Sequence, residues 1–110
     1  MAAATRRAAF VLAAAAAGCG AALADDIDAG RAKATACAVC HGPLGVSTQM
    51  DAPNLAAQPA VYLAAQLRAN RSGARKHEVM AVIAKPLSDD DIAKLAAWFS
   101  SIRIEATAPR

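Results

Sequence analysis

The chain has 110 residues, enough for one small domain. Its formal charge is +3, but two of its twelve basic residues, Arg6 and Arg7, lie in an N-terminal segment that we expect to be removed. Ten Lys and Arg then remain against nine Asp and Glu, so charge gives no support for nucleic-acid binding, and we expect no nucleic-acid partner.

The first 24 residues have the pattern of a secretory signal peptide. Arg6 and Arg7 form a basic start, an apolar stretch follows over 8–18, and Ala22-Leu23-Ala24 supplies an A-x-A cleavage site. We therefore expect a signal peptide over 1–24, cleavage after Ala24, and a periplasmic domain over 25–110. An uncleaved anchor is the alternative, although the apolar stretch is shorter than the about 20 residues that span a bilayer.

Cys19 allows two interpretations. It is either a small apolar residue of a discarded leader, or part of a lipoprotein processing site formed by 16–19, in which case Cys19 carries lipid. A lipoprotein processing site usually has Leu at the position of Ala16, so we favour the interpretation as part of a discarded leader. Membrane attachment is expected only if Cys19 is lipidated or the leader is retained.

The expected mature domain is poor in large apolar side chains, with one Trp, one Tyr and one Phe (Phe99). Small domains bury a low fraction of their surface and commonly need a disulfide, a metal or a large apolar cofactor. A first helix is predicted over 26–38, and at its end lies Cys37-Ala38-Val39-Cys40-His41. This C-x-x-C-H pattern predicts covalent haem attachment through Cys37 and Cys40, with His41 ligating the iron.

Two alternatives need no haem. A disulfide or a redox-active dithiol would also use C-x-x-C, but these sites are typical of a βαβ context and leave His41 unexplained. A structural zinc site would need a fourth ligand, and His77 is the sole other His in the chain.

After the motif, the sequence predicts one loop and two helices. Gly and Pro punctuate a loop over 42–59, and a second helix is predicted over 60–70, with Pro59 at its start and Gly73 beyond its end. Ser88 is a good N-cap for a last helix, in which Ile92, Leu95, Ala96, Phe99 and Ile102 form one apolar face. We see no strand pattern, so the predicted fold class is all-α.

The chain resembles class I c-type cytochromes, most of all the short bacterial monohaem type whose domain also forms each half of certain dihaem cytochromes. The resemblance covers about 27–104. It is carried by CAVCHGPLG at 37–45, PNLAAQ at 53–58, YLAAQLRANRSGAR at 62–75 and VMAVIAKPLSDDDIAKLAAWF at 79–99.

The resemblance implies a helical domain wrapped around one haem c, with the first and last helices crossing where Gly30 faces Trp98 and Phe99. It also implies that the Pro53 carbonyl accepts a hydrogen bond from His41. Such a bond orients a ligating imidazole. Ala57 departs from the family pattern, which usually has Gly there, and puts the local turn in question.

Further positions near the haem are less specific. Tyr62 and Gln66, one turn apart, either face the haem or pack in the core. Arg75 matches a family Arg near the haem propionates. Alternatively, the Arg75 side chain is solvated as part of a basic cluster with Arg71 and Lys76. This cluster would also suit docking of an acidic partner.

The sixth iron ligand has three candidates. Met80 matches the family position, Met50 lies in the loop after the motif, and His77 is most simply a surface residue. We favour Met80, with Met50, His77 and an open site as alternatives.

With His41 and Met80 on the iron, both axial positions are filled, and we expect a non-enzymatic electron carrier that exchanges electrons with redox protein partners. The alternatives are a cytochrome subunit of a periplasmic dehydrogenase complex and a haem sensor or catalytic haem with an open site.

Overall fold

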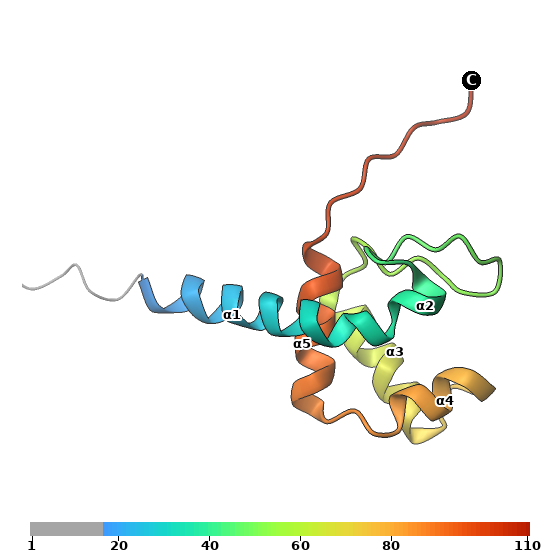
Figure 1. The fold of residues 1–110 in the computed structure, drawn as a ribbon, viewed down its shortest axis with the longest axis horizontal. Helices are drawn as coiled ribbons and strands as arrows, with labels where there is room; N and C mark the ends of the chain where they lie inside the picture. The colour runs from blue at the N-terminus through green and yellow to red at the C-terminus, as the bar shows by residue number, and fades with distance from the viewer. Residues whose placement is uncertain (1–16) are drawn as a thin grey trace, which may run out of the picture.

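The computed structural model describes residues 17–110, with side chains from Gly20 onward. Its elements are α1 (Ala17–Lys33), the 3-10 turn η1 (Ala34–Ala36), α2 (Ala38–His41), α3 (Ala60–Ser72), α4 (Glu78–Ala84) and α5 (Asp89–Ser101). No strand occurs among the described residues, as the sequence predicts. Figure 1 shows α1 crossing α5, with α3 beside α5 and α4 beyond the end of α3.

The first helix differs from the predicted 26–38. It already includes residues 17–25, where Ala, the residue of highest helix propensity, is frequent, and it ends at Lys33, before η1 and α2 carry the chain through the motif. Residues 20–26 are all exposed, and Figure 1 shows this end of α1 extending beyond the other helices. Arg6 and Arg7 of the expected signal peptide lie outside the described residues, as does the Cys19 side chain.

No helix in residues 17–110 has the length and apolar character needed to cross a membrane.

The crossing of α1 and α5 depends on Gly30. A Cβ at this position would overlap the Lys94 carbonyl and approach the Trp98 Cβ to 2.9 Å. The Arg31 guanidinium lies 5.6 Å from the centre of the Trp98 ring, in cation–π range. The predicted approach of Gly30 to Trp98 is therefore present, whereas the Phe99 ring reaches toward Gly45 in the loop after the motif.

The core forms where α5 meets α1 and α3. Ile92, Leu95, Ala96 and Phe99 of the predicted apolar face are buried, and Ile102 is half-buried. The α5 N-terminus carries a reciprocal capping box, in which Ser88 Oγ accepts from Asp91 N–H at 3.0 Å and an Asp91 carboxylate oxygen accepts from Ser88 N–H at 3.1 Å. The sequence predicts this helix and its cap correctly.

The middle of the chain holds one predicted helix and one that the sequence does not predict. The second predicted helix is α3, which continues two residues beyond Asn70 and ends at Gly73 in a left-handed conformation (φ 82°). The short α4 follows, and it packs against α3.

Candidate functional site

The motif residues lie at the junction of η1 and α2. Cys37 is half-buried and Cys40 is exposed, and no disulfide joins them. His41, the last residue of α2, is 7 % exposed, and its backbone N–H donates to the Cys37 carbonyl at 3.0 Å. One turn of helix thus holds the two sulfurs and the imidazole together.

The chain turns sharply after His41. Gly42 has a positive φ of 82°, and a Cβ there would overlap the Val46 carbonyl, so a residue without a side chain is required. The loop then returns toward α2, where the Pro53 carbonyl accepts a hydrogen bond from His41 Nδ1 at 2.7 Å. The hydrogen bond expected from the sequence is therefore present.

This bond assigns the two imidazole nitrogens. A carbonyl oxygen can only accept, so Nδ1 carries the proton and Nε2 presents its lone pair. A neutral imidazole with one nitrogen held by a carbonyl is the usual arrangement of a metal-ligating His.

Three polar side chains, which the sequence analysis did not identify, hold the loop together and join it to α2. Ser47 Oγ donates to the Cys40 carbonyl at 3.0 Å, and Gln49 Nε2 donates to the Val39 carbonyl at 3.1 Å. Asn54 Oδ1 accepts from the Ser47 N–H at 2.7 Å, next to Pro53. Ser and Asn in a Gly/Pro-rich loop were the available signal, because these side chains commonly bond to nearby backbone.

The remaining predicted residues lie on α3, α4 and the connections. Tyr62 is 49 % exposed, which does not fit a buried core position, and Gln66 is half-buried. Arg75, just after α3, donates from Nη1 to Gln66 Oε1 at 2.9 Å. Met80 is half-buried in α4, whereas the Met50 side chain is fully exposed.

The basic cluster is partly engaged within the protein. Arg71 donates from Nη1 to the Leu87 carbonyl at 2.9 Å and from Nη2 to Asp89 at 2.6 Å, and this guanidinium holds the pKa of the Asp89 carboxyl below its usual value. Arg71 therefore joins α3 to the start of α5 and is not an independent surface charge.

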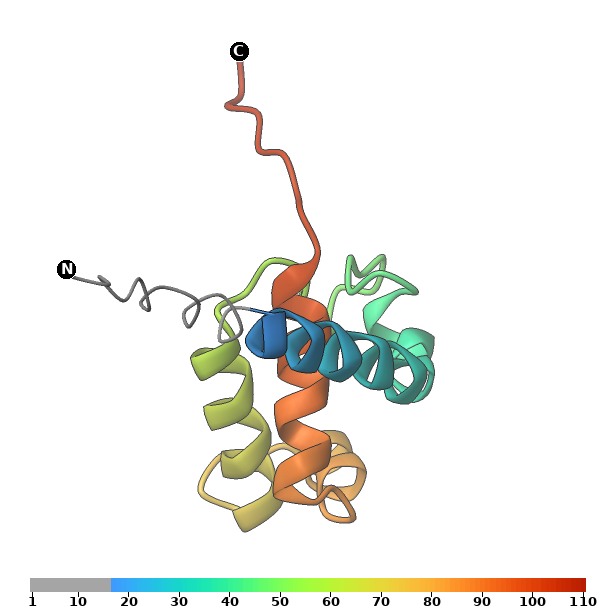
Figure 2. The same cartoon turned by 90° about the vertical axis from the view of Figure 1, so that its left-hand side faces the viewer.

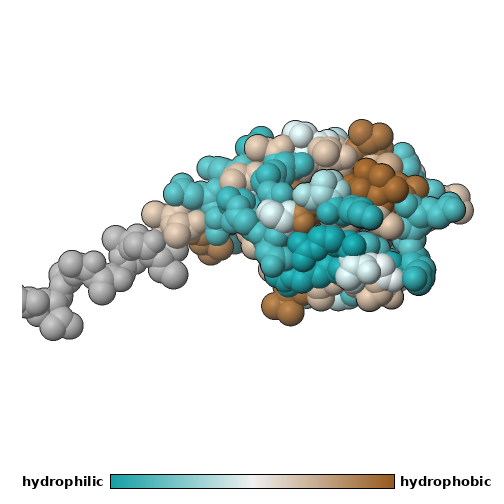
Figure 3. All heavy atoms as spheres, turned by 90° about the horizontal axis from the view of Figure 1, so that it is seen from below, coloured by the Kyte–Doolittle hydropathy of each residue, from teal (hydrophilic) through white to brown (hydrophobic). Residues whose placement is uncertain are grey.

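Apolar side chains are unusually exposed around the motif and on α4. Val39, Leu44 and Val46 are 80, 56 and 50 % exposed in α2 and its loop, and Val82 is 72 % exposed in α4. Figure 3 shows hydrophobic patches among the hydrophilic residues on one face of the molecule. Apolar surface of this kind marks a place that a ligand or partner covers.

The donor set and the surface fit a haem. Two free thiols stand beside an imidazole with an available Nε2, and exposed apolar side chains surround them. In both ribbon views α2 and α4 lie on the same side of α5, so the elements that bear His41 and Met80 share one side of the domain (Figures 1 and 2).

Two observations concern the alternatives that need no haem. Burial raises the pKa of the Cys37 thiol, whereas a reactive dithiol needs a lowered one. Among the described residues, no group of three or more His, Cys, Asp or Glu side chains is placed to hold a metal ion such as zinc.

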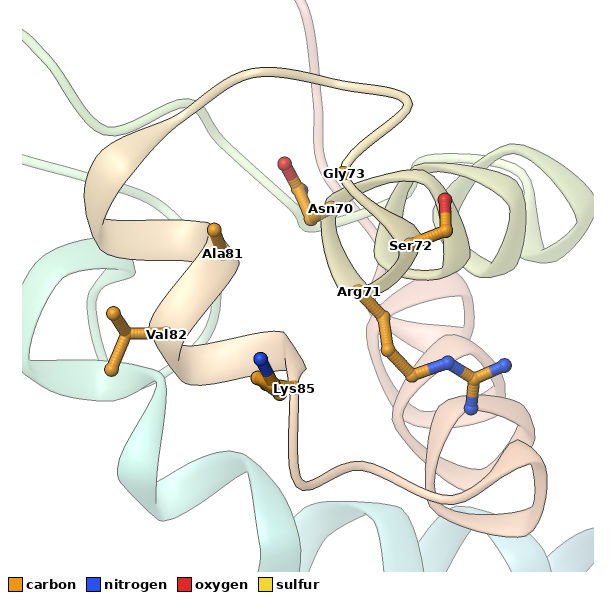
Figure 4. Close-up of a pocket in the computed structure, with 7 residues that line it drawn as sticks. All are labelled: Asn70, Arg71, Ser72, Gly73, Ala81, Val82 and Lys85. Atoms are coloured by element: carbon orange, nitrogen blue, oxygen red, sulfur yellow. The ribbon is translucent and has the colours of Figure 1, made fainter.

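A separate cavity of about 300 Å³ lies between the end of α3 and α4, lined by Asn70, Arg71, Ser72, Gly73, Ala81, Val82 and Lys85. Figure 4 shows the Asn70 amide projecting from the end of α3, while the Arg71 side chain points away from α4. Asn70 is 4 % exposed, and its Oδ1 has no hydrogen-bond partner within the described residues. The contact between α3 and α4 is therefore incomplete here.

Comparison with known proteins agrees with this site. The family model for cytochrome c matches residues 27–103. Cytochrome c-554(548) of Halomonas halodenitrificans is 42 % identical over 81 residues, which cover 71 % of this chain and 98 % of that protein.

Two longer proteins match over part of their length. The thiosulfate dehydrogenase electron acceptor of Stutzerimonas stutzeri is 42 % identical over 69 residues, 60 % of this chain and 32 % of that protein. The crystal structure of reduced recombinant cytochrome c4 from Pseudomonas stutzeri superposes with a TM-score of 0.66 at 36 % identity, over 70 % of this chain and 45 % of that one. The chain thus spans less than half the length of these two relatives.

The expected relationship to class I cytochromes and to halves of dihaem cytochromes is confirmed. The chain belongs to the cytochrome c family, with the class I cytochrome c fold and a covalently attached haem c as its cofactor.

Proposed function

We propose that the protein is a single-haem, periplasmic electron carrier and not an enzyme. Cys37 and Cys40 would hold the haem through two thioether links, and His41 Nε2 and Met80 would ligate its iron. The hydrogen bond from His41 Nδ1 to the Pro53 carbonyl carries the proposal, because it leaves Nε2 available as a neutral ligand beside two free thiols.

Met80 is favoured over the other candidates for the sixth position. Met50 is fully exposed at the loop surface, and the His77 imidazole is engaged at the start of α4. A thioether is a soft ligand that raises the potential of a haem, and haem bound in this way supplies one-electron exchange between Fe(III) and Fe(II). With His41 and Met80 both ligating the iron, no position would remain for a substrate to bind it directly.

The chain's own residues have defined tasks in this function. Pro53 holds the His41 ring in one orientation and increases its basicity as a ligand. Tyr62 would contact the haem edge from α3, and Arg75, which donates to Gln66, would pair with a propionate. Processing after Ala24 would remove the exposed part of α1 that lies N-terminal to the crossing at Gly30.

Removal of each Met tests the ligand assignment. We expect the oxidised protein to show the weak sulfur-to-iron band at the red end of its spectrum, Met80→Ala to abolish it, and Met50→Ala to leave it unchanged. Persistence of the band in Met80→Ala, with its loss in Met50→Ala, would show the assignment to be wrong. Rapid binding of CO by the reduced wild-type protein would instead indicate an open sixth site.

One relative supports a second candidate, which is the electron-accepting partner of a dehydrogenase. The matched part of the Stutzerimonas stutzeri protein belongs to a thiosulfate dehydrogenase electron acceptor. Mixing the oxidised protein with a reduced dehydrogenase of this type would test it. Stable co-elution and fast haem reduction support a complex, whereas fast reduction without co-elution supports the diffusible carrier.

A further inference from the structure

The helix that bears Met80 begins with an unusual cap. His77 has extended backbone angles (φ −156°, ψ 118°), and its Nδ1 accepts a hydrogen bond from the Met80 N–H at 3.2 Å. Its carbonyl accepts from the Ala81 N–H at 2.9 Å. The bond from the Ala81 N–H is the first backbone bond of the helix, so the His77 side chain supplies the partner for one further N–H, that of Met80, which the first turn would otherwise leave unpaired.

The geometry makes α4 more dependent on its cap than the longer helices are. It has seven residues, too few to be stable by itself, and α3 is the helix against which it packs. The cavity beside Asn70 lies within that contact and is lined by Ala81 and Val82, the residues directly after Met80. Packing against α3 is therefore incomplete along α4 from Ala81 onward.

The far end of α4 is held differently. The Leu87 N–H donates to the Ala84 carbonyl at 3.0 Å, and Arg71 fixes the Leu87 carbonyl from α3. These bonds hold the segment that follows α4, whereas Met80 lies in the first turn of α4. Met80 itself is bonded through its N–H, which donates to His77 Nδ1.

We propose that His77 is a positioning residue for the axial ligand: by capping α4 at the Met80 N–H, it holds the Met80 thioether in place to ligate the iron. The inference rests on the proposed function, in which Met80 is that ligand. His77 does not itself touch the iron in this account. Its role requires an acceptor atom at the cap position and no other property of the imidazole.

Competition by added imidazole for the sixth position measures how firmly Met80 is held. We expect imidazole to bind oxidised His77→Ala about fivefold more tightly than wild type, the equivalent of about 1 kcal/mol for loss of an N-cap. His77→Asn, which retains a capping acceptor, should bind imidazole within about twofold of wild type. Loss of the sulfur-to-iron band reports the binding in each case.

A matched control separates positioning from general stability. Ser88→Ala removes the side-chain cap of α5 and should lower the unfolding temperature, yet leave imidazole affinity within about twofold of wild type. Equal tightening in Ser88→Ala and His77→Ala would overturn the proposal, because the effect would then follow stability alone. Should His77→Ala yield no holoprotein, His77→Val replaces it, since Val suits the extended backbone and has no acceptor.

The outcomes distinguish this inference from the function on which it rests. If Met80→Ala keeps the sulfur-to-iron band, the ligand assignment itself fails. If Met80→Ala loses the band while His77→Ala binds imidazole as wild type does, or His77→Asn fails to restore wild-type affinity, the positioning role alone is wrong.

Discussion

His41 Nδ1 and the Pro53 carbonyl oxygen lie 2.7 Å apart, across a loop that begins at Gly42. This bond places the imidazole with Nε2 available and ties its orientation to the folding of the loop. The loop in turn depends on the bond between Asn54 Oδ1 and the Ser47 N–H, at 2.7 Å. Ligand orientation and loop stability are therefore linked.

Asn54→Ala tests that link. Loss of the acceptor for the Ser47 N–H should cost about 0.5 kcal/mol, at the low end for a hydrogen bond because the bond is exposed. Weaker support of Pro53 makes His41 a less basic ligand, so the reduction potential should rise. Asn54→Asp keeps the acceptor and is the control. Denaturant unfolding and redox titration measure both effects, and an unchanged potential in Asn54→Ala would contradict the link.

Ala57 should gain stability when it is replaced by Gly. Its φ is +62°, and this left-handed conformation costs an L-residue roughly 1–2 kcal/mol, partly offset by the greater flexibility of unfolded Gly. We expect a net gain of about 0.5 kcal/mol, or about 2–4 °C in thermal unfolding. The same replacement at Ala93, exposed in α5, should instead lose about 1 kcal/mol. A loss of stability in Ala57→Gly would show that the turn is not strained.

Acid should weaken the junction of α1 and α5 through Asp91. A hydrogen bond from Lys33 of α1, at 2.6 Å, and those from Ser88 lower the pKa of this carboxyl to about 2, from 3.8. Because the pKa of Asp91 is lower in the folded state, its carboxylate stabilises the fold fully above about pH 4. This stabilisation is lost as the pH falls toward 2.

The difference in unfolding temperature between wild type and Asp91→Asn should therefore shrink from pH 5 to pH 2. Thermal unfolding followed by circular dichroism measures it, with Asp51→Asn as a control for the loss of one exposed negative charge. A difference that stays constant over this range would rule out the ion pair as its source.

Much of the architecture could be predicted because its signals are local. Ser88 and Asp91 stand at the spacing of a capping box before an apolar face, and Gly73 ends α3 in a left-handed conformation. The C-x-x-C-H spacing likewise identified the cofactor. The resemblance located Pro53, whose bond to His41 is long-range in sequence.

Other features escaped prediction for physical reasons. The helix α4 is short and begins at His77, which is not among the preferred N-cap residues, although Pro86 shortly after its end is a usual stop signal. The extension of α1 to residues before Asp26 followed from Ala propensity, which outweighed Gly20. The pairing of Arg71 with Asp89 joins residues distant in sequence, so spacing alone could not indicate it.

The central claim is that two thioethers and one imidazole hold a single haem in this small helical domain. A pyridine haemochrome assay, combined with the intact mass of protein matured in a periplasm, tests it most directly. We expect one haem c per chain and the mass of residues 25–110 plus one haem. Colourless, correctly exported protein with the Cys37 and Cys40 sulfurs free, or joined to each other, would contradict it.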